Sequence, residues 1–376
     1  MTDTTLITRD PAFRPLVERW HSFWAMEEPA RPLWVVPTTP GMSPPNRFGL
    51  PMVHYLRDGA TQLAGQLRLL EWRDRANVGD DFIPHLQPQG GTSVFASAFG
   101  CEVEYFDHTL PWAHAVIGPD DPPEKVYDLA APGVTAGQLG EMLAYTDLFV
   151  AETGKRYPIA VTDLQGPLDT AYLIWDPCSF MVAMYTNPKE VHHLMRLVTD
   201  LIIRFVKEQR RRSPEFIPCH FPPLYLPDGA GLAISEDVLA VIGADLYREF
   251  ALPYNNELSE EFGGLFVHSC GNFVHQFDNV ASIRGLRGIN FGATENPFGP
   301  TWERFGGRVA VVPHIGLNKE IHFDTALAYA EHILSTKTTN RGLCLLVAPE
   351  DSATVDDPAA FRRFVADVQA LIERRG

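Results

Sequence analysis

The residue types and spacing of His268-Ser269-Cys270 suggest a metal site. An imidazole and a thiolate two residues apart at the end of a short apolar run can reach one ion, because the chain leaves the pleat of a strand there, and zinc suits both donors. Cys344 is a candidate third ligand and Glu295 a candidate fourth. The alternative is structural, with His268 hydrogen-bonded in the interior and the cysteines filling the core, where free cysteines usually lie.

Three further candidates follow apolar runs directly, where predicted strands end: Asp163, His220 and His314. In a barrel of parallel strands these ends meet at one rim, so the side chains are expected near His268. Asp163 and His220 are candidate catalytic residues, as general acid and base or as acceptors behind the metal ligands. His314, like His322, is instead typical of a structural or surface histidine.

Four more polar residues are candidates for orienting substrate or ligands. Asn272 is a candidate catalytic residue, and the alternative is that it caps the helix after the metal loop. His275 and Asn290 are candidate substrate-binding residues, and Asn290 could equally hydrogen-bond within the core. Tyr225, also a candidate substrate-binding residue, lies in a loop bounded by proline and glycine that either closes over substrate or is an ordinary connection.

Short apolar runs alternate with longer helical patterns after about residue 155, which is typical of βα units. Strands are predicted at 33–36, 158–162, 216–219, 265–268, 288–291, 308–312 and 342–347, with an eighth between 80 and 98. Helices are predicted at 188–212, with Asn187 as N-cap, and from 357 onward. We therefore predict an α/β fold, a (β/α)8 TIM-type barrel, with a doubly wound open sheet as the alternative.

The whole chain, 1–376, is predicted to be a single domain, since no linker or composition shift divides it. The segment 37–132 is rich in proline, glycine and aromatic residues. It is predicted to be an irregular N-terminal insertion or a cap over the active site.

Composition narrows the function classes. The chain has 376 residues, with 31 Lys+Arg and 47 Asp+Glu, and a formal net charge of −16, so we expect no nucleic acid partner. No stretch approaches the roughly 20 apolar residues of a membrane span and the N-terminus is polar, so we expect a cytoplasmic protein. Five widely spaced cysteines indicate reduced thiols. Neither a nucleotide-binding glycine pattern nor a serine hydrolase elbow occurs.

The block His268-Ser269-Cys270-Gly271-Asn272, preceded by Tyr-Arg-Glu-Phe-Ala-Leu-Pro-Tyr at 247–254, resembles the uroporphyrinogen decarboxylase superfamily, which includes zinc-dependent cobalamin:thiol methyltransferases. Three other segments are similar to blocks of that family: 80–84 with 99–102, 165–169, and 187–191 with its helix. The resemblance extends over about residues 12–372. It implies a TIM-type barrel, often a homodimer.

The methyltransferase branch resembles this chain better at the metal site. The resemblance implies zinc held by His268, Cys270 and Cys344, with Glu295 as fourth ligand or as a solvated loop carboxylate. It also implies methyl transfer, in either direction, between a small-molecule thiol and a methylated compound or a methylcobalamin carried by a separate corrinoid protein.

Two other functions stay open. A metal-independent decarboxylase of a tetrapyrrole or small carboxylic acid is the second hypothesis, since Asp80 and Asp81 lie near the position of that family's catalytic aspartate. The arginine-rich motif of those enzymes is barely retained at 29–34, and an acidic chain is poorly equipped to bind a polyacidic substrate. The third hypothesis is a non-catalytic barrel that binds a corrinoid protein or a tetrapyrrole.

Overall fold

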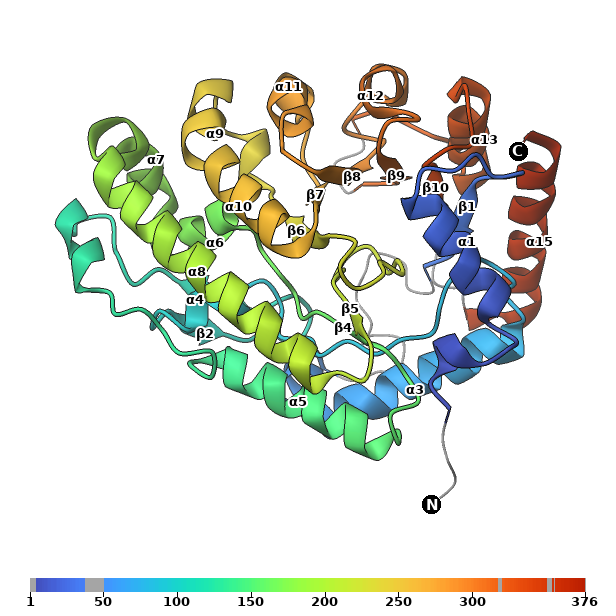
Figure 1. Cartoon of the computed structure of the whole chain (residues 1–376), viewed down its shortest axis with the longest axis horizontal. Helices are drawn as coiled ribbons and strands as arrows, with labels where there is room; N and C mark the ends of the chain where they lie inside the picture. The colour runs from blue at the N-terminus through green and yellow to red at the C-terminus, as the bar shows by residue number, and fades with distance from the viewer. Residues whose placement is uncertain (1–4, 38–50, 317–319, 350–353, 355, 376) are drawn as a thin grey trace.

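The computed structural model describes residues 5–37, 51–316, 320–349, 354 and 356–375, and it has a mixed α/β fold with parallel strands (Figure 1). Within these residues the parallel strands are β1 (Leu33–Val35), β4 (Ile159–Ala160), β5 (Phe216–Ile217), β6 (Leu232–Ser235), β7 (Leu265–Ser269), β8 (Leu286–Gly292), β9 (Ala310–His314) and β10 (Cys344–Leu346). The α/β class is therefore confirmed, while the closed eight-stranded barrel stays a prediction.

Strands β6 to β9 form a continuous four-stranded parallel sheet. A bridge between Val311 and Leu343 links β9 to the start of β10, which pairs with β1. On the other side β4 pairs with β5, and bridges join Leu86 to Ile159 and Gln165 to Ser235. Because these strands are parallel, their carboxyl ends lie on the same side of the molecule, where polar residues of different strands can meet.

Strand β6 was not among the strands predicted from the sequence, which assigned the preceding residues to a loop. Its four residues are all buried, so they show no alternation of apolar and polar residues, and they follow Gly229 and Gly231, both with positive φ. The predicted eighth strand between 80 and 98 is instead mostly irregular. It contributes one bridge, at Leu86, and the short helix α4 (Val94–Ser97).

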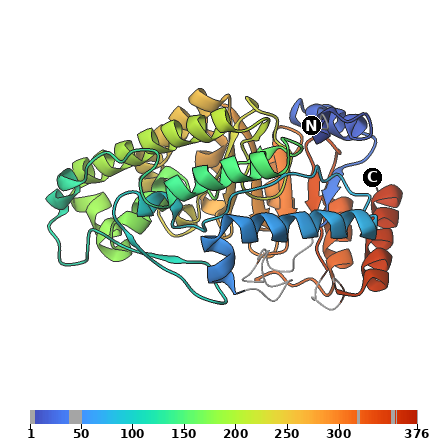
Figure 2. The ribbon, with the colours of Figure 1, turned by 90° about the horizontal axis from the view of Figure 1, so that it is seen from below.

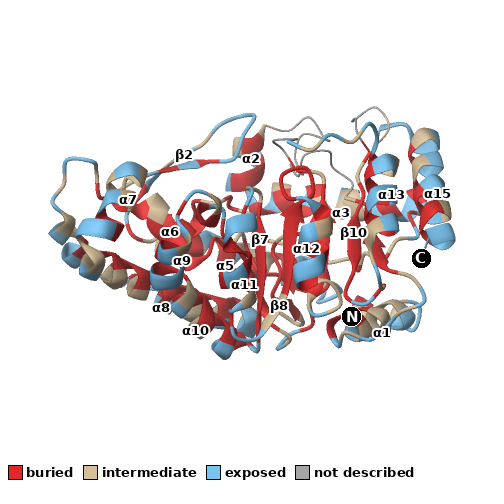
Figure 3. Cartoon of the chain, turned by 90° about the horizontal axis from the view of Figure 1, so that it is seen from above, coloured by how far each residue is buried: buried red, intermediate tan, exposed pale blue. Residues whose placement is uncertain are grey.

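Helices lie outside the strands (Figures 1 and 2), and their outward faces are exposed (Figure 3). In the described part of the chain after residue 130, the helices with given bounds are α5 (Gln138–Glu152), α6 (Pro167–Ile174), α7 (Pro177–Thr186), α8 (Pro188–Arg212), α9 (Ala244–Phe250), α10 (Leu252–Phe262), α11 (Phe277–Ala281), α12 (Phe298–Phe305), α13 (Ala326–Thr336) and α15 (Pro358–Arg375), with short 3-10 turns at Val238–Ala240 and Val274–Gln276. None of the described helices is long and apolar enough to cross a membrane.

Helix α8 has the predicted bounds. Its apolar residues at helical spacing, from Val191 to Phe205, are buried as expected for an amphipathic helix. Asn187 occupies the N-cap position, but its side chain makes no capping hydrogen bond. Proline at the first helical position sets the helical φ there, and so it helps to define where the helix starts.

The segment 37–132 is more regular than expected in its described part. It contains α2 (Met52–Arg57), α4, an antiparallel hairpin of β2 (Glu102–Glu104) and β3 (Trp112–His114), a 3-10 turn at Pro123–Asp128 and the long helix α3 (Gly59–Ala76). Asp58 caps α3 by accepting from two backbone N–H groups. The buried face of α3 includes Gln62 and Arg73, so apolar periodicity does not reveal the helix.

Alternation along the strands decides which side chains face the interior. In β7, Phe266 packs in an apolar cluster with Ala310 and Val312 of β9, whereas its neighbours Leu265 and Val267 pack in a second, larger cluster with residues of the helices. A strand has a period of two, so His268 lies on the same face as Phe266. The first α-helix, α1 (Arg14–Trp24), adds Trp20, Phe23 and Trp24 to the interior cluster.

Asp80 and Asp81 connect the chain before Leu86 to β1 and α3. Asp81 is buried, pairs with Arg31 at 2.7 Å and with Arg19, and accepts from the Trp34 backbone N–H at 3.0 Å. Asp80 accepts from Arg73 at 2.7 Å through both oxygens and from the backbone of Val36. Both carboxylates therefore have structural partners.

We expect Asp81→Ala to lower the free energy of unfolding by about 2 kcal/mol, because it leaves the buried Trp34 N–H without an acceptor and removes the counter-charge of two arginines. The cost is less than for a fully buried pair, since the Arg31 and Arg19 side chains are 29% and 37% exposed. Urea denaturation at pH 7 measures the change.

Glu71→Ala is the matched control, since Glu71 forms an exposed i,i+4 pair with Arg75. Such a pair contributes about 0.3–0.5 kcal/mol. Equal urea midpoints for the two variants would show that the Asp81 network does not stabilise the fold.

Candidate metal centre

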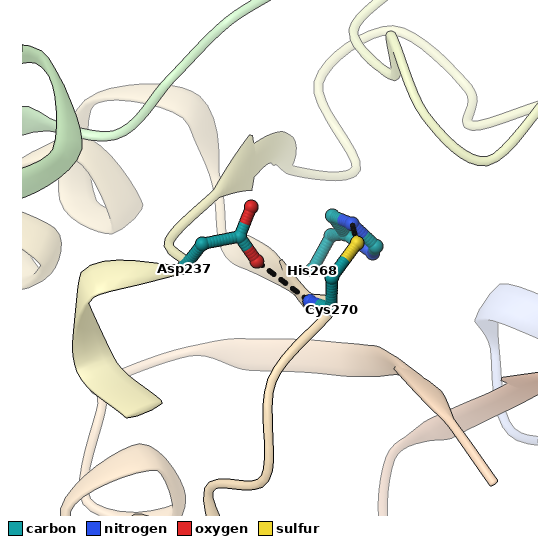
Figure 4. A group of neighbouring side chains, drawn as sticks. All are labelled: Asp237, His268 and Cys270. Carbon is teal, nitrogen blue, oxygen red and sulfur yellow. Dashed lines mark hydrogen bonds between the residues drawn. The ribbon is translucent and has the colours of Figure 1, made fainter. Parts of the chain in front are cut away.

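His268, Cys270 and Asp237 form the candidate metal centre (Figure 4). One potential ligand atom from each lies within 4.8 Å of the other two. His268 Nε2 is 3.2 Å from Cys270 Sγ, and Asp237 Oδ1 accepts a 2.6 Å hydrogen bond from the Cys270 backbone N–H. Imidazole nitrogen, thiolate and carboxylate are all donors that bind zinc in proteins.

Asn290 orients the imidazole of His268. The two residues are opposite each other in the β7–β8 register, and His268 Nδ1 is 2.6 Å from Asn290 Oδ1. The amide nitrogen of Asn290 donates to the Val312 carbonyl at 2.5 Å, so Oδ1 is the acceptor and His268 Nδ1 carries the proton. The unprotonated Nε2 then lies on the side of Cys270, which is the tautomer that a metal ligand needs.

Acidic side chains lie behind the centre. Asp169 accepts a 2.6 Å hydrogen bond from the Asp237 backbone N–H, and burial raises the pKa of Asp169 well above its usual range. Glu236 is buried, accepts from Tyr247 and Asn255, and has its pKa raised by burial to about 7. Several carboxyl groups in little solvent favour either protonation or a bound cation.

Burial and the neighbouring carboxylates also change the pKa of the Cys270 thiol. Burial, followed by the charges of Asp237, Glu295 and Asp169, raises the pKa of Cys270 to about 12. In the metal-free protein the thiol is therefore protonated at pH 7. A cation bound between Cys270 and Asp237 would reverse this preference, since a coordinating thiol is deprotonated.

Asp163 and His220 lie beside the centre. Asp163 accepts a 2.7 Å hydrogen bond from Gln165, and burial together with the charge of Asp237 raises its pKa to about 6. His220 Nε2 is 2.9 Å from Ser235 Oγ, at the end of β6, and burial lowers the pKa of His220 to about 3. Asp163 can thus exchange a proton near neutral pH, whereas His220 is neutral.

Cys344 and Glu295 are not members of the three-residue group found among the described residues. Cys344 is the first residue of β10, is fully buried, and packs in the interior apolar cluster with Phe266 and Val312, so it occupies the place of a core cysteine. A metal ligand at the rim of the strands would be expected at the carboxyl end of β10, not at its first residue. Glu295 is buried and accepts from the Thr294 hydroxyl at 2.7 Å, and its charge acts on Cys270 electrostatically.

Three other predicted site residues, Asn272, His275 and Tyr225, form hydrogen bonds away from the three candidate ligands. Asn272 is exposed and accepts from the Val274 backbone N–H at 3.3 Å, and the exposed His275 has Nε2 3.0 Å from the Ile242 carbonyl. Tyr225 differs more from expectation, because its hydroxyl donates to Glu215, directly before β5. Tyr225 therefore lies at the amino end of the strands, on the side opposite to the centre.

Sequence reasoning missed Asp237, and with it the third member of the group. The rule that identified His268 and Asp163, a polar residue directly after an apolar run, also fits Glu236 and Asp237, which follow Leu232–Ser235. The signal was overlooked because that run was not recognised as a strand. His314, expected to be structural, lies at the end of β9, and its Nδ1 accepts a 3.2 Å hydrogen bond from the Asn290 amide.

A cavity of about 240 Å3 lies beside the centre and includes His220, Phe221 and His314 in its wall. The ring of Phe221 is 4.6 Å from the His268 ring, and the ring of His314 is 5.8 Å from it. The cavity thus lies one side-chain layer away from the candidate metal ligands.

Residues 91–220 match the family model described as uroporphyrinogen decarboxylase (URO-D), and no curated protein matches the chain. A methyltransferase from Methanosarcina mazei shares the fold, with a TM-score of 0.68 and 15% identity over 94% of this chain and 98% of that one. A B12-independent methionine synthase from Shewanella sp. W3-18-1, in complex with selenomethionine, has a TM-score of 0.47 and 13% identity over 84% and 89% of the two chains.

The family match ends at His220, so the candidate metal ligands lie after it in the sequence. The fold similarity to the Methanosarcina protein, in contrast, covers nearly all of both chains. The resemblance to the uroporphyrinogen decarboxylase superfamily that the sequence motifs predict is therefore confirmed, and residues 91–220 are the part of the chain that matches the family model.

Proposed function

We propose that this protein is a zinc-dependent methyltransferase or demethylase that moves a methyl group between a corrinoid protein or small methylated compound and a thiol. The observation that carries the proposal is the convergence of His268, Cys270 and Asp237, with Asn290 holding the imidazole in the ligand tautomer. The fold shared with a methyltransferase supports it. A closed (β/α)8 barrel, with this centre at its carboxyl rim, is part of the proposal.

The donor set fits a zinc ion. Zinc binds nitrogen at about 2.0–2.1 Å and sulfur at about 2.3 Å. The donor atoms lie within 4.8 Å of one another, so a small closing movement of the side chains would bring all three onto one ion. One neutral imidazole, one thiolate and one carboxylate balance the charge of Zn2+. Three protein ligands also leave a fourth position for a substrate, as in catalytic zinc sites. The chemistry that zinc supplies when bound is a lower pKa for a thiol substrate, which favours the nucleophilic thiolate.

The protein's own groups prepare this chemistry. Asn290 keeps the proton of His268 on Nδ1, away from the ligand atom. Asp163, with a pKa of about 6, accepts the proton that a thiol substrate releases near neutral pH. Phe221 packs edge-on against the His268 ring and so helps to hold it in place. Asn272 and His275, on the exposed loop after Cys270, are proposed to contact the substrate or the partner protein.

A decarboxylase is less well supported. Asp80 and Asp81, the residues nearest to that family's catalytic aspartate in sequence, are engaged by Arg73, Arg31 and Arg19. Their carboxylates stabilise the link between β1 and α3 and are poorly placed to protonate a substrate. Arg31, the arginine retained from the decarboxylase motif region, pairs with Asp81 and so does not offer its charge to a substrate carboxylate.

Metal content tests the proposed centre. We expect about one zinc per chain in protein purified without chelators, measured by inductively coupled plasma mass spectrometry. Cys270→Ala and His268→Ala should lose it, because each removes one of three donors. Asp237→Asn should weaken zinc binding by at least tenfold in a competition titration with a chromogenic chelator, since the amide lacks the charge of the carboxylate.

Two cysteine variants serve as controls. Cys178→Ala removes an exposed thiol and Cys344→Ala removes a buried core thiol, and both should retain zinc. Loss of zinc in Cys344→Ala, with an unchanged circular dichroism spectrum, would make Cys344 the third ligand in place of Asp237. Wild-type protein that binds no zinc even after reconstitution under reducing conditions would contradict the metal centre altogether.

Asn290 should act as a positioning residue for His268. Asn290→Leu is expected to weaken zinc binding by about 10–100-fold, the usual effect of removing a hydrogen-bond partner of a ligating histidine. Asn290→Asp keeps an acceptor for His268 Nδ1–H, so it should retain most of the affinity. Chelator competition measures both, and equal losses in the two variants would mean that Asn290 acts only through packing.

Activity can be tested with free methylcobalamin and 2-mercaptoethanol, by following the change in visible absorbance as the cobalt–carbon bond breaks. The zinc-loaded wild type should accelerate the reaction, and Cys270→Ala should lower the rate by at least 100-fold. Asp163→Asn should bind zinc normally but lower kcat about 100-fold, since it cannot accept the thiol proton. Chelator-treated protein that reacts as fast as zinc-loaded protein would refute the mechanism.

A further inference from the structure

We infer that the cavity beside the metal centre binds an uncharged, compact substrate built on one apolar ring, such as an aromatic methyl ether. The inference rests on the proposed function, for which it names the class of the methylated substrate. Three observations support the inference: the size of the cavity, the apolar character of its wall and the pairing of its arginine with an aspartate. None of them depends on a bound metal.

The volume fits one ring. The cavity measures about 240 Å3. Benzene occupies an apolar cavity of about 150 Å3, and drug-sized ligands occupy pockets of about 300–1,000 Å3. A six-membered ring with one or two small substituents therefore fits, whereas a macrocycle such as a tetrapyrrole is too large to be enclosed.

The wall is mostly apolar. Leu69 and Leu70 of α3, Val36 after β1 and Leu346 of β10 contribute aliphatic side chains, and Phe82 and Phe221 contribute aromatic rings. Aromatic side chains pack favourably against another ring in edge or offset geometry. Burying apolar substrate surface here contributes most of the binding free energy.

The histidines in the wall offer hydrogen bonds without charge. His85 donates from Nδ1 to the Ile83 carbonyl at 2.8 Å, and burial lowers its pKa to about 4, so the ring is neutral at pH 7. His314 Nδ1 accepts from the Asn290 amide at 3.2 Å, so its proton lies on Nε2. Neutral donors and acceptors of this kind suit an ether oxygen or a hydroxyl group.

Arg73 is the one cation among the described residues that line the cavity. Its guanidinium donates to both oxygens of Asp80 at 2.7 Å and to the Val36 carbonyl at 2.7 Å, and it lies 4.2 Å from the centre of the Phe82 ring. The side chain is only 9% exposed. Its charge is thus balanced by Asp80, and an anionic substrate would enter without an available counter-charge.

The cavity is the neighbour of the candidate metal centre, and the side chains of Phe221 and His314 lie between the two. Phe221 and His314 form part of its wall and their rings are within 6 Å of the His268 ring. A ring bound against these side chains lies one side-chain layer from His268. The same wall separates the ring itself from the acidic residues behind Asp237.

Isothermal titration calorimetry with two matched probes tests the inference, on zinc-loaded and on metal-free protein. The probes 4-methoxybenzyl alcohol and 4-methoxybenzoate share one skeleton and differ in charge. We expect saturable 1:1 binding of the alcohol and at least tenfold weaker binding of the benzoate, in both forms of the protein. Equal or tighter binding of the benzoate, or no binding of the alcohol, would overturn the inference.

Variants locate the binding. Ala348→Phe fills the cavity from the end of β10, and Leu69→Trp fills it from α3, so each should weaken binding of the alcohol at least tenfold. Ala328→Phe, on the exposed face of α13, is the matched control and should bind as the wild type does. Undiminished binding in both cavity variants would overturn the assignment of the ring to this cavity.

The outcomes separate this inference from the proposed function. Alcohol binding by a wild-type protein that cannot be loaded with zinc would retain the substrate class and refute the metal centre. Stoichiometric zinc with methylcobalamin:thiol activity, but without alcohol binding, would retain the function and refute the substrate class.

Discussion

The pairing register of β7 and β8 is the constraint on which the candidate site depends. It sets His268 opposite Asn290, so that the amide oxygen meets Nδ1 of the imidazole and the other ring nitrogen is left for Cys270. A shift by one residue would reverse the face of every side chain in the strand and would point His268 toward the helices. The extensive burial of β7 and β8 makes such a shift costly, since it would place apolar side chains on the wrong face.

The polar groups around His268 are tolerated in the interior because they form hydrogen bonds with one another. Asn290 bonds to His268, to the Val312 carbonyl and to His314, so its amide makes contacts in three directions. A buried network of this kind is stable when its members are paired and is destabilising when they are not. It also gives one orientation to the imidazole, and a metal site needs that before the ion arrives.

Charge divides the carboxyl side of the molecule into two environments. Asp237, Asp169 and Glu236 make the surroundings of Cys270 acidic, which suits a cation. The cavity on the other side of Phe221 is apolar, and its arginine is balanced by Asp80. A cation and an uncharged substrate can therefore bind side by side without competing for the same groups.

Local sequence patterns were enough to predict the α/β class, the bounds of α8, the family resemblance and the nearness of His268 to Cys270. Each depends on local pattern: apolar periodicity, proline at a helix start, or a short motif. The third member of the group and the positions of Cys344 and Tyr225, in contrast, depend on how distant parts of the chain pack together. Asp237 follows a four-residue buried strand with no alternation, and its nearness to Cys270 arises from the pairing of β6 with β7. Cys344 and Tyr225 are candidates by residue type. What each side chain contacts depends on the face of the strand that it occupies and on the end of the strand at which it lies, and residue type alone gives neither.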